Sequence, residues 1–249
     1  MSTRSLPSAP AERVAAVWDA DGLGILEGAV AEFASAATLS DASAWATARR
    51  EEVADRVVDV VAARAWHALP EPSHGRARRV ARRCIAYSLA SDTVRVGGSN
   101  TARADCWVLT THALDLLTIP EHFDAAANRS RELLGRAPRG RLLAAWQMVD
   151  DSLAAQSTTR HEWVGADPET VAAAGWVLVD RMSRLLIASA LVAQSAATES
   201  SPVTELLVNA ARRYAWNHLR RPAPEAATPT HVQRSAELVH AFLTPGTFP

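Results

Sequence analysis

The stretch that decides the fold is DPETVAAAGWVLVDRMSRLLIASALVAQS, residues 167–195. Its Asp-Pro start is the strongest helix signal in the chain. The Asp side chain can accept a hydrogen bond from a free N–H of the first turn, and Pro has no N–H to leave unpaired. The residues that follow are apolar nearly all round, which is typical of a helix enclosed by others. We therefore predict an all-α fold around a central, buried helix over about residues 168–195.

Helix signals recur on both sides of this stretch, while strand signals are nearly absent. A short β-like run, Thr93 to Val96, falls in a loop predicted over residues 92–100. We expect one domain over residues 1–249, either a multi-helix bundle or a globular helical array. A Pro-rich linker over residues 221–229 leads to the last helix. The other predicted helices cover about residues 8–18, 22–37, 41–69, 73–91, 101–119, 121–138, 142–153, 202–219 and 230–243.

The composition favours an ordered, globular chain without a membrane span. The 249 residues are 48% hydrophobic and 21% charged, with a net charge of −1. This balance argues against nucleic-acid binding, which usually requires a strongly basic domain. The N-terminus shows no apolar leader, and the most apolar stretch is interrupted by Asp180, Arg181 and Arg184. Two cysteines are too few for a disulfide framework. These features predict a cytoplasmic location.

Arginines crowd the predicted start of the helix that follows Ser73. All 26 basic residues of the chain are Arg. Positive charge at a helix N-terminus interacts unfavourably with the helix dipole, so five arginines there require an explanation. One interpretation is an anion site, because helix N–H groups and guanidinium forks both suit phosphate or carboxylate. The other is a solvated face paired with acids of the preceding helix, such as Glu51, Glu52 and Asp55. The five arginines are Arg76, Arg78, Arg79, Arg82 and Arg83.

The glycine pair Gly97-Gly98 precedes the next predicted helix, which carries Arg103. Adjacent glycines before a helix can form a nest of N–H groups that binds an anion. The spacing does not match a P-loop, which also requires a Lys. The loop is either an ordinary turn or a contributor to the same anion site as the arginines.

Three polar residues, Asp105, His112 and Asp115, interrupt the otherwise apolar run DCWVLTTHALDLL, residues 105–117. Asp105 and His112 fall on one side at helical spacing, and Asp115 lies three residues after His112. A carboxylate beside an imidazole fixes its tautomer and strengthens it as a general base. The same spacing also fits a core histidine whose ring N–H is satisfied by Asp115.

Asp150 and Asp151 follow Trp146 on a predicted helix. This pair resembles the first half of the magnesium–diphosphate site of class I terpene and prenyl synthases. That motif has a further acid three residues on, where this chain has Ala154. The resemblance implies a degenerate isoprenoid-synthase-like enzyme, in which tryptophans line a pocket for a cation. The nearest counterpart of the family's second motif, NxxxSxxxE, is Asn209-xxx-Arg213-xxx-Asn217.

Trp176, Asp180 and Arg184 repeat every four residues along the predicted central helix, so they share one face. Asp and Arg at this spacing satisfy each other. The pair is either structural or lines a pocket between helices, where ligand sites of helical bundles form.

Two functions from different classes remain open. In the first, the protein binds a small anionic, phosphate- or carboxylate-bearing molecule in a pocket between helices, with acid–base catalysis as an option. In the second, it is a non-catalytic interaction or regulatory module whose arginine-rich helix meets an acidic protein surface. The sequence leaves the cofactor unknown, shows no metal-binding pattern and leaves a homo-oligomer open. In the first function Arg79, Arg82, Arg83 and Arg103 hold the anion, His112 with Asp115 is the base, and Asp105, Trp146, Asp150, Asp151, Trp176, Asp180 and Arg184 line the pocket.

Overall fold

The computed structural model describes residues 9–36, 44–70, 72, 75–97, 100–137, 140–164, 166–197 and 202–220. Over these ranges the chain forms α-helices, one short 3-10 turn at Gly140–Leu142, and no strand, which confirms the predicted all-α class. The helices are α1 (Ala9–Ala36), α2 (Ala44–His67), α3 (Gly75–Arg95), α4 (Asn100–Leu117), α5 (Pro120–Gly135), α6 (Leu143–Val164), α7 (Pro168–Ala174), α8 (Trp176–Ala197) and α9 (Pro202–Leu219).

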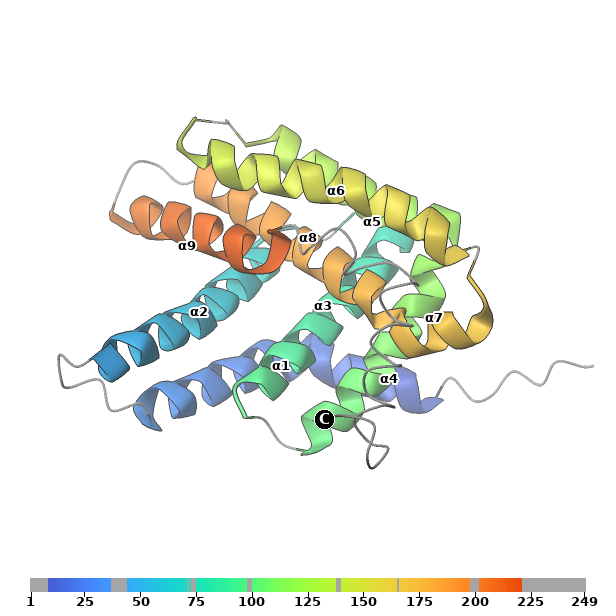
Figure 1. The fold of residues 1–249 in the computed structure, drawn as a ribbon, viewed down its shortest axis with the longest axis horizontal. Helices are drawn as coiled ribbons and strands as arrows, with labels where there is room; N and C mark the ends of the chain where they lie inside the picture. The colour runs from blue at the N-terminus through green and yellow to red at the C-terminus, as the bar shows by residue number, and fades with distance from the viewer. Residues whose placement is uncertain are drawn as a thin grey trace, which may run out of the picture.

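Helix α8 lies at the centre of the array (Figure 1) and contacts α2, α3, α4, α5, α6 and α9. An unbroken run from Met182 to Ala193 is buried, so neighbouring helices cover α8 on every side. This confirms the central, buried helix. None of the helices in the described ranges combines the length and the apolar character that crossing a bilayer requires.

The predicted helix over residues 168–195 is two helices in the structure, which corrects its boundaries. Asp167 does cap the first of them, since its Oδ1 accepts a hydrogen bond of 2.9 Å from Thr170 N. Gly175 then separates α7 from α8. A Cβ on Gly175 would lie 2.4 Å from Cδ2 of Leu114 and 2.6 Å from the carbonyl oxygen of Val171, so only glycine fits this contact with α4.

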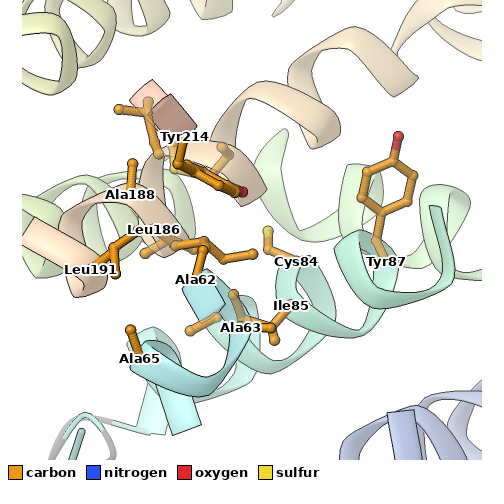
Figure 2. Packing of buried hydrophobic residues seen from close by; sticks show 14 of the residues in the cluster. Ala62, Ala63, Ala65, Cys84, Ile85, Tyr87, Leu186, Ala188, Leu191 and Tyr214 are labelled. Carbon is orange, nitrogen blue, oxygen red and sulfur yellow. The ribbon is translucent and has the colours of Figure 1, made fainter. Parts of the chain in front are cut away.

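Small side chains bring α2 close to its neighbours in the core. Figure 2 shows Ala62 and Ala63 of α2 beside Cys84 and Ile85 of α3 and Leu186 of α8. All five side chains belong to the largest cluster of buried apolar residues. Alanine at a helix contact shortens the distance between the helix axes, which depends on the side chains there. The Ala-rich composition therefore serves tight packing of α2, α3 and α8.

Two further predictions of local structure are wrong. The first two predicted helices form one helix, α1, in which Gly22 is buried, and a Cβ there would lie 3.0 Å from Cδ1 of Leu89. The β-like run that starts at Thr93 continues α3 instead, and Thr93 Oγ1 donates to the carbonyl oxygen of Leu89 at 2.8 Å. A buried Thr can remain helical when its hydroxyl bonds the backbone one turn back. The predicted linker at 221–229 and the last predicted helix lie outside the described residues.

Candidate functional site

The arginine-rich start of α3 borders two adjoining hollows, which we call the arginine cleft. The larger has a volume of about 470 Å³ and lies between α1, the end of α2, α3 and α5. The smaller, of about 380 Å³, lies between α1 and α3. Both volumes fall in the range of small-molecule sites. The two hollows share Ala16, Asp19, Arg78 and Arg82.

Pro70 and Pro72 follow the end of α2 at His67, and both line the larger hollow. Two arginines bind the backbone carbonyl groups of these prolines. Arg78 Nε donates to the carbonyl oxygen of Pro72 at 3.4 Å, and Arg129 Nη2 donates to that of Pro70 at 2.8 Å. Gly75, the first residue of α3, also lines the smaller hollow, so the N-terminal end of the helix faces it.

Carboxylates of α1 pair with part of the positive charge of the arginines. Arg83 is nearly buried and pairs with Glu12 and, at 3.9 Å, with Asp19. The expected partners Glu51 and Asp55 instead pair with Arg213 of α9, at 2.8 and 2.6 Å. At these contacts Glu51 and Asp55 are therefore engaged by α9. Four arginines and two carboxylates line the smaller hollow, so it is cationic. Its charged residues are Glu12, Asp19, Arg78, Arg79, Arg82 and Arg83.

Arg129 of α5 is a cleft residue that the sequence did not reveal. Its side chain is only 5% exposed, with Nη1 donating to Glu132 at 2.9 Å and Nη2 donating to Pro70. Its buried Nε has no hydrogen-bond partner among the described residues. Leaving a buried donor unpaired costs about 1–3 kcal/mol. The available signal was its place on the apolar face of α5, between Ala126 and Leu133.

The larger hollow has an apolar wall, formed by Trp18, Trp66, Leu69 and Ile85. The predicted site residue Asp105 fixes one of these side chains, because its Oδ2 accepts a hydrogen bond of 3.0 Å from Trp18 Nε1. Burial lowers the pKa of His67, which also lines this hollow, so its ring is neutral at pH 7 and the positive charge comes from arginines alone.

The remaining predicted residues of the anion site are dispersed over other parts of the molecule. The structure places no hydrogen bond between His112 and Asp115, and Asp115 is exposed. Trp146 points its Nε1 at the carbonyl oxygen of Leu134, at 3.2 Å. In the described ranges, no three His, Cys, Asp or Glu side chains are grouped so that they could hold a metal ion. The predicted site residues that line neither hollow of the arginine cleft are Arg103, Asp105, His112, Asp115, Trp146, Asp150, Asp151, Trp176, Asp180 and Arg184.

The glycine loop lies at the other end of α3 from the arginines. Gly97, the second residue after the end of α3, adopts a positive φ of 92°, while Gly98 and Ser99 lie outside the described residues. The 21 residues of α3 span about 30 Å at 1.5 Å per residue. The loop therefore does not share an anion with the arginine-rich helix start, which corrects that expectation.

Arg184 is enclosed in the core and lines no pocket that a ligand could enter, since its side chain is 0% exposed. Asp180 approaches its Nε at 3.4 Å, as the spacing predicted, but its main partner is Asp92 of α3, which accepts two hydrogen bonds of 2.7 Å. Ser88 Oγ lies 3.0 Å from Nη1. The sequence did not reveal Asp92 because that residue was assigned to a loop. The structural interpretation of the central Asp–Arg face is the one that this geometry supports.

Neither models of protein families, nor curated proteins, nor solved structures give a match to this chain.

Proposed function

We propose that the protein binds a small molecule with an anionic group and an apolar body in the arginine cleft. The observation that carries the proposal is the way the two hollows adjoin. They share Arg78 and Arg82, yet arginines wall one of them and tryptophans wall the other. A ligand that spans both would place its charge and its apolar part in different surroundings.

The smaller hollow suits the anionic group. Arg79 and Arg82 are exposed on α3 one turn apart, and Gly75 brings the helix N-terminus to the same place. Guanidinium groups bind carboxylate or phosphate through two parallel hydrogen bonds, and free N–H groups at a helix start add to the attraction. A phosphate or a carboxylate is therefore the expected head group.

The larger hollow suits the rest of the ligand. Trp18 and Trp66 supply aromatic surface, and Leu69 and Ile85 supply aliphatic surface. Ligand pockets combine such apolar walls with a few polar groups that fix orientation. Arg129 also lines this hollow.

The test uses probes that separate the charge from the apolar body: 1-naphthyl phosphate, 1-naphthoate, 1-naphthol and inorganic phosphate. A ligand at 100 times its Kd contributes about 2.7 kcal/mol, which raises the Tm of a chain of this size by roughly 5–11 °C. We expect the two naphthyl anions to raise the Tm, inorganic phosphate to act more weakly, and 1-naphthol to have little effect. Trp18 and Trp66 also make quenching of tryptophan fluorescence a direct readout.

Variants assign the binding to the cleft. Arg82→Gln should remove most of the ligand-induced rise in Tm, whereas Arg103→Gln, an exposed arginine of α4 outside the cleft, should keep it. The Tm of each variant is compared with and without ligand, so that a change in the stability of the unliganded variant does not affect the ligand-induced rise. Equal rises in the two variants, or no rise with either anion, would overturn the proposal.

A second candidate is the non-catalytic interaction module with an acidic protein partner. The observation that favours it is that Arg76 and Arg79 are exposed on the first turns of α3. It predicts no response to the naphthyl probes, together with salt-sensitive binding of poly-glutamate that Arg76→Gln/Arg79→Gln abolishes. Both candidates include a cytoplasmic location, which the two free cysteines support because reducing compartments keep thiols unpaired. Cell fractionation tests it.

A further inference from the structure

An apolar groove lies between α2 and α9, with a volume of about 760 Å³. The two helices contact each other at the end of the array opposite α7 (Figure 1). The groove shares no lining residue with either hollow of the arginine cleft, so it is a separate feature of the surface. Its apolar lining includes Val53, Val57 and Val61 of α2 and Leu206, Leu207 and Ala210 of α9.

Two apolar side chains of the groove project into solvent. Val57 of α2 is 43% exposed and Leu206 of α9 is 69% exposed. A single exposed apolar residue is ordinary, but two that border one apolar groove form a continuous patch, and such patches mark interaction surfaces. A small molecule inside the groove would leave Leu206 in water. A second protein surface would cover both side chains.

Opposite charges flank Val57 along α2. Glu51 lies six positions before Val57 and Arg64 lies seven positions after it. At the rise of an α-helix, each charge is about 10 Å from Val57. Both side chains reach into solvent, since that of Glu51 is 67% exposed and that of Arg64 is 63% exposed. The charges of α2 are therefore placed almost symmetrically about an apolar centre.

This pattern of charge on α2 is complementary to itself. In a twofold dimer every contact occurs twice, because the same patch of each copy faces the other. If α2 of two copies cross in antiparallel directions at Val57, Glu51 of each copy lies opposite the partner's Arg64. Parallel helices would bring like charges together, which disfavours that arrangement. The charges thus favour a second copy of this chain, bound antiparallel, as the occupant of the groove.

The ion pairs that these residues form within one chain leave room for a second contact. Arg64 donates from Nε to Glu27 at 2.7 Å, and a guanidinium has four further N–H donors. Glu51 Oε2 accepts from Arg213 Nη2 at 2.8 Å, and a carboxylate can accept several hydrogen bonds. Exposed pairs of this kind contribute at most about 1 kcal/mol, so both side chains can adjust to a partner.

We propose that the groove between α2 and α9 is the interface of a twofold homodimer. In the dimer, α2 and α9 of each copy pack on those of the other and form a four-helix bundle, which buries its core between facing helices. Val57 and Leu206 are covered between the copies, and the pairs of Glu51 with the partner's Arg64 flank this core. The proposal does not depend on ligand binding in the arginine cleft.

Sedimentation equilibrium of the full chain, over micromolar to submillimolar concentrations, tests the proposal. We expect a reversible transition to twice the mass of the chain. Val57→Asp and Leu206→Asp should each raise the Kd of the dimer at least about a hundredfold, because each buries an unpaired carboxylate in both copies. Val17→Asp is the matched control, since Val17 is an exposed valine of α1 outside the groove, and it should dimerise normally. Circular dichroism checks that each variant is folded.

Two outcomes of this experiment would overturn the proposal. One is a monomer at every concentration, which is expected if residues 221–249 or a different protein occupy the groove. The other is a dimer that neither Val57→Asp nor Leu206→Asp weakens, because its interface would then lie elsewhere.

Reversal of charge tests the antiparallel arrangement. Arg64→Glu and Glu51→Arg should each raise the Kd about tenfold, since each replaces two attractive contacts between the copies by two repulsive ones. The double variant Glu51→Arg/Arg64→Glu restores attraction between the copies, so its Kd should return to within about threefold of the wild type. It still lacks the pairs with Glu27 and Arg213, so an effect that arose within one chain would not be rescued. Arg103→Glu on α4 is the control for a change of net charge and should dimerise normally. A double variant no tighter than the two single variants would refute the arrangement.

Discussion

Asp92 of α3 and Arg184 of α8 face each other in the core and are joined by two parallel hydrogen bonds of 2.7 Å. Their side chains are 4% and 0% exposed. Desolvation of such a pair offsets much of its Coulomb attraction, so the intact pair is weak evidence for stability. The loss of one partner, however, strands the other charge in an apolar interior.

Arg184→Met should therefore be strongly destabilising, by about 3–5 kcal/mol, because it leaves Asp92 buried without its partner. Adding Asp92→Asn to this variant removes the stranded charge, so the double variant should be more stable than Arg184→Met alone. Urea unfolding followed by circular dichroism measures both. Arg136→Gln, which breaks an exposed pair with Glu132, is the control and should cost less than about 1 kcal/mol. A double variant less stable than Arg184→Met would contradict this account.

The Asp92–Arg184 pair should also make the free energy of unfolding sensitive to acid. Burial raises the pKa of Asp92, but the charge and hydrogen bonds of Arg184 outweigh it, so the pKa lies below its usual value. A carboxyl group whose pKa is lower in the folded state contributes stability that is fully present above the unfolded pKa of about 3.9 and is lost as the pH falls through the folded pKa. We expect the free energy of unfolding to fall below about pH 4, and to fall less steeply in Asp92→Asn/Arg184→Met. Urea unfolding at a series of pH values measures the slopes.

Two glycines should respond to alanine in opposite directions. Gly175→Ala places a Cβ 2.4 Å from Leu114, so we expect a loss of about 1–3 kcal/mol from overpacking. Gly28→Ala lies within α1 with nothing within 4 Å of the added Cβ, and should gain up to about 1 kcal/mol of helix stability. Thermal unfolding of the two variants compares them directly. A neutral Gly175→Ala would show that α4 and α7 adjust freely at this contact.

The two free cysteines should resist alkylation in the folded protein. Burial raises the pKa of Cys84 to about 12, and partial burial raises that of Cys106. Because the thiolate is the nucleophile, iodoacetamide at pH 8 should react slowly, first at half-buried Cys106. Unfolding in urea should bring both to the rate of a free thiol, as followed by mass spectrometry. Alkylation of Cys84 ahead of Cys106 would contradict the burial described here.

Local signals predicted much of the fold. Asp167 and Pro168 mark a helix start through chemistry confined to a few residues, and the structure confirms it. The break at Gly175 was missed, and the contact that excludes a Cβ there involves Leu114, which lies on another helix. The break predicted between residues 18 and 22 was wrong, and local signals do not show that Gly22 lies against Leu89 of α3 within one continuous helix. The interpretation of residues 1–249 as one domain stays a prediction.

The candidate sites were less accessible from sequence, because they depend on distant partners. The crowding of Arg78, Arg79, Arg82 and Arg83 was visible in the sequence. The ion pair between Arg83 and Glu12 of α1 was not, and neither was the place of Arg129 in the lining of the cleft. Val57 of α2 and Leu206 of α9 border one groove although they lie far apart in the sequence, and no spacing rule connects them.

The enclosed guanidinium of Arg184 also constrains the route by which the chain folds. It carries its charge at every pH at which the protein exists. A collapsed intermediate that covered α8 before α3 arrived would trap this charge in apolar surroundings, at a cost of several kcal/mol. We therefore expect α3 to dock on α8 before α5, α6 and α9 close over it. In partly folded states that lack this step, Arg184 should stay in contact with water.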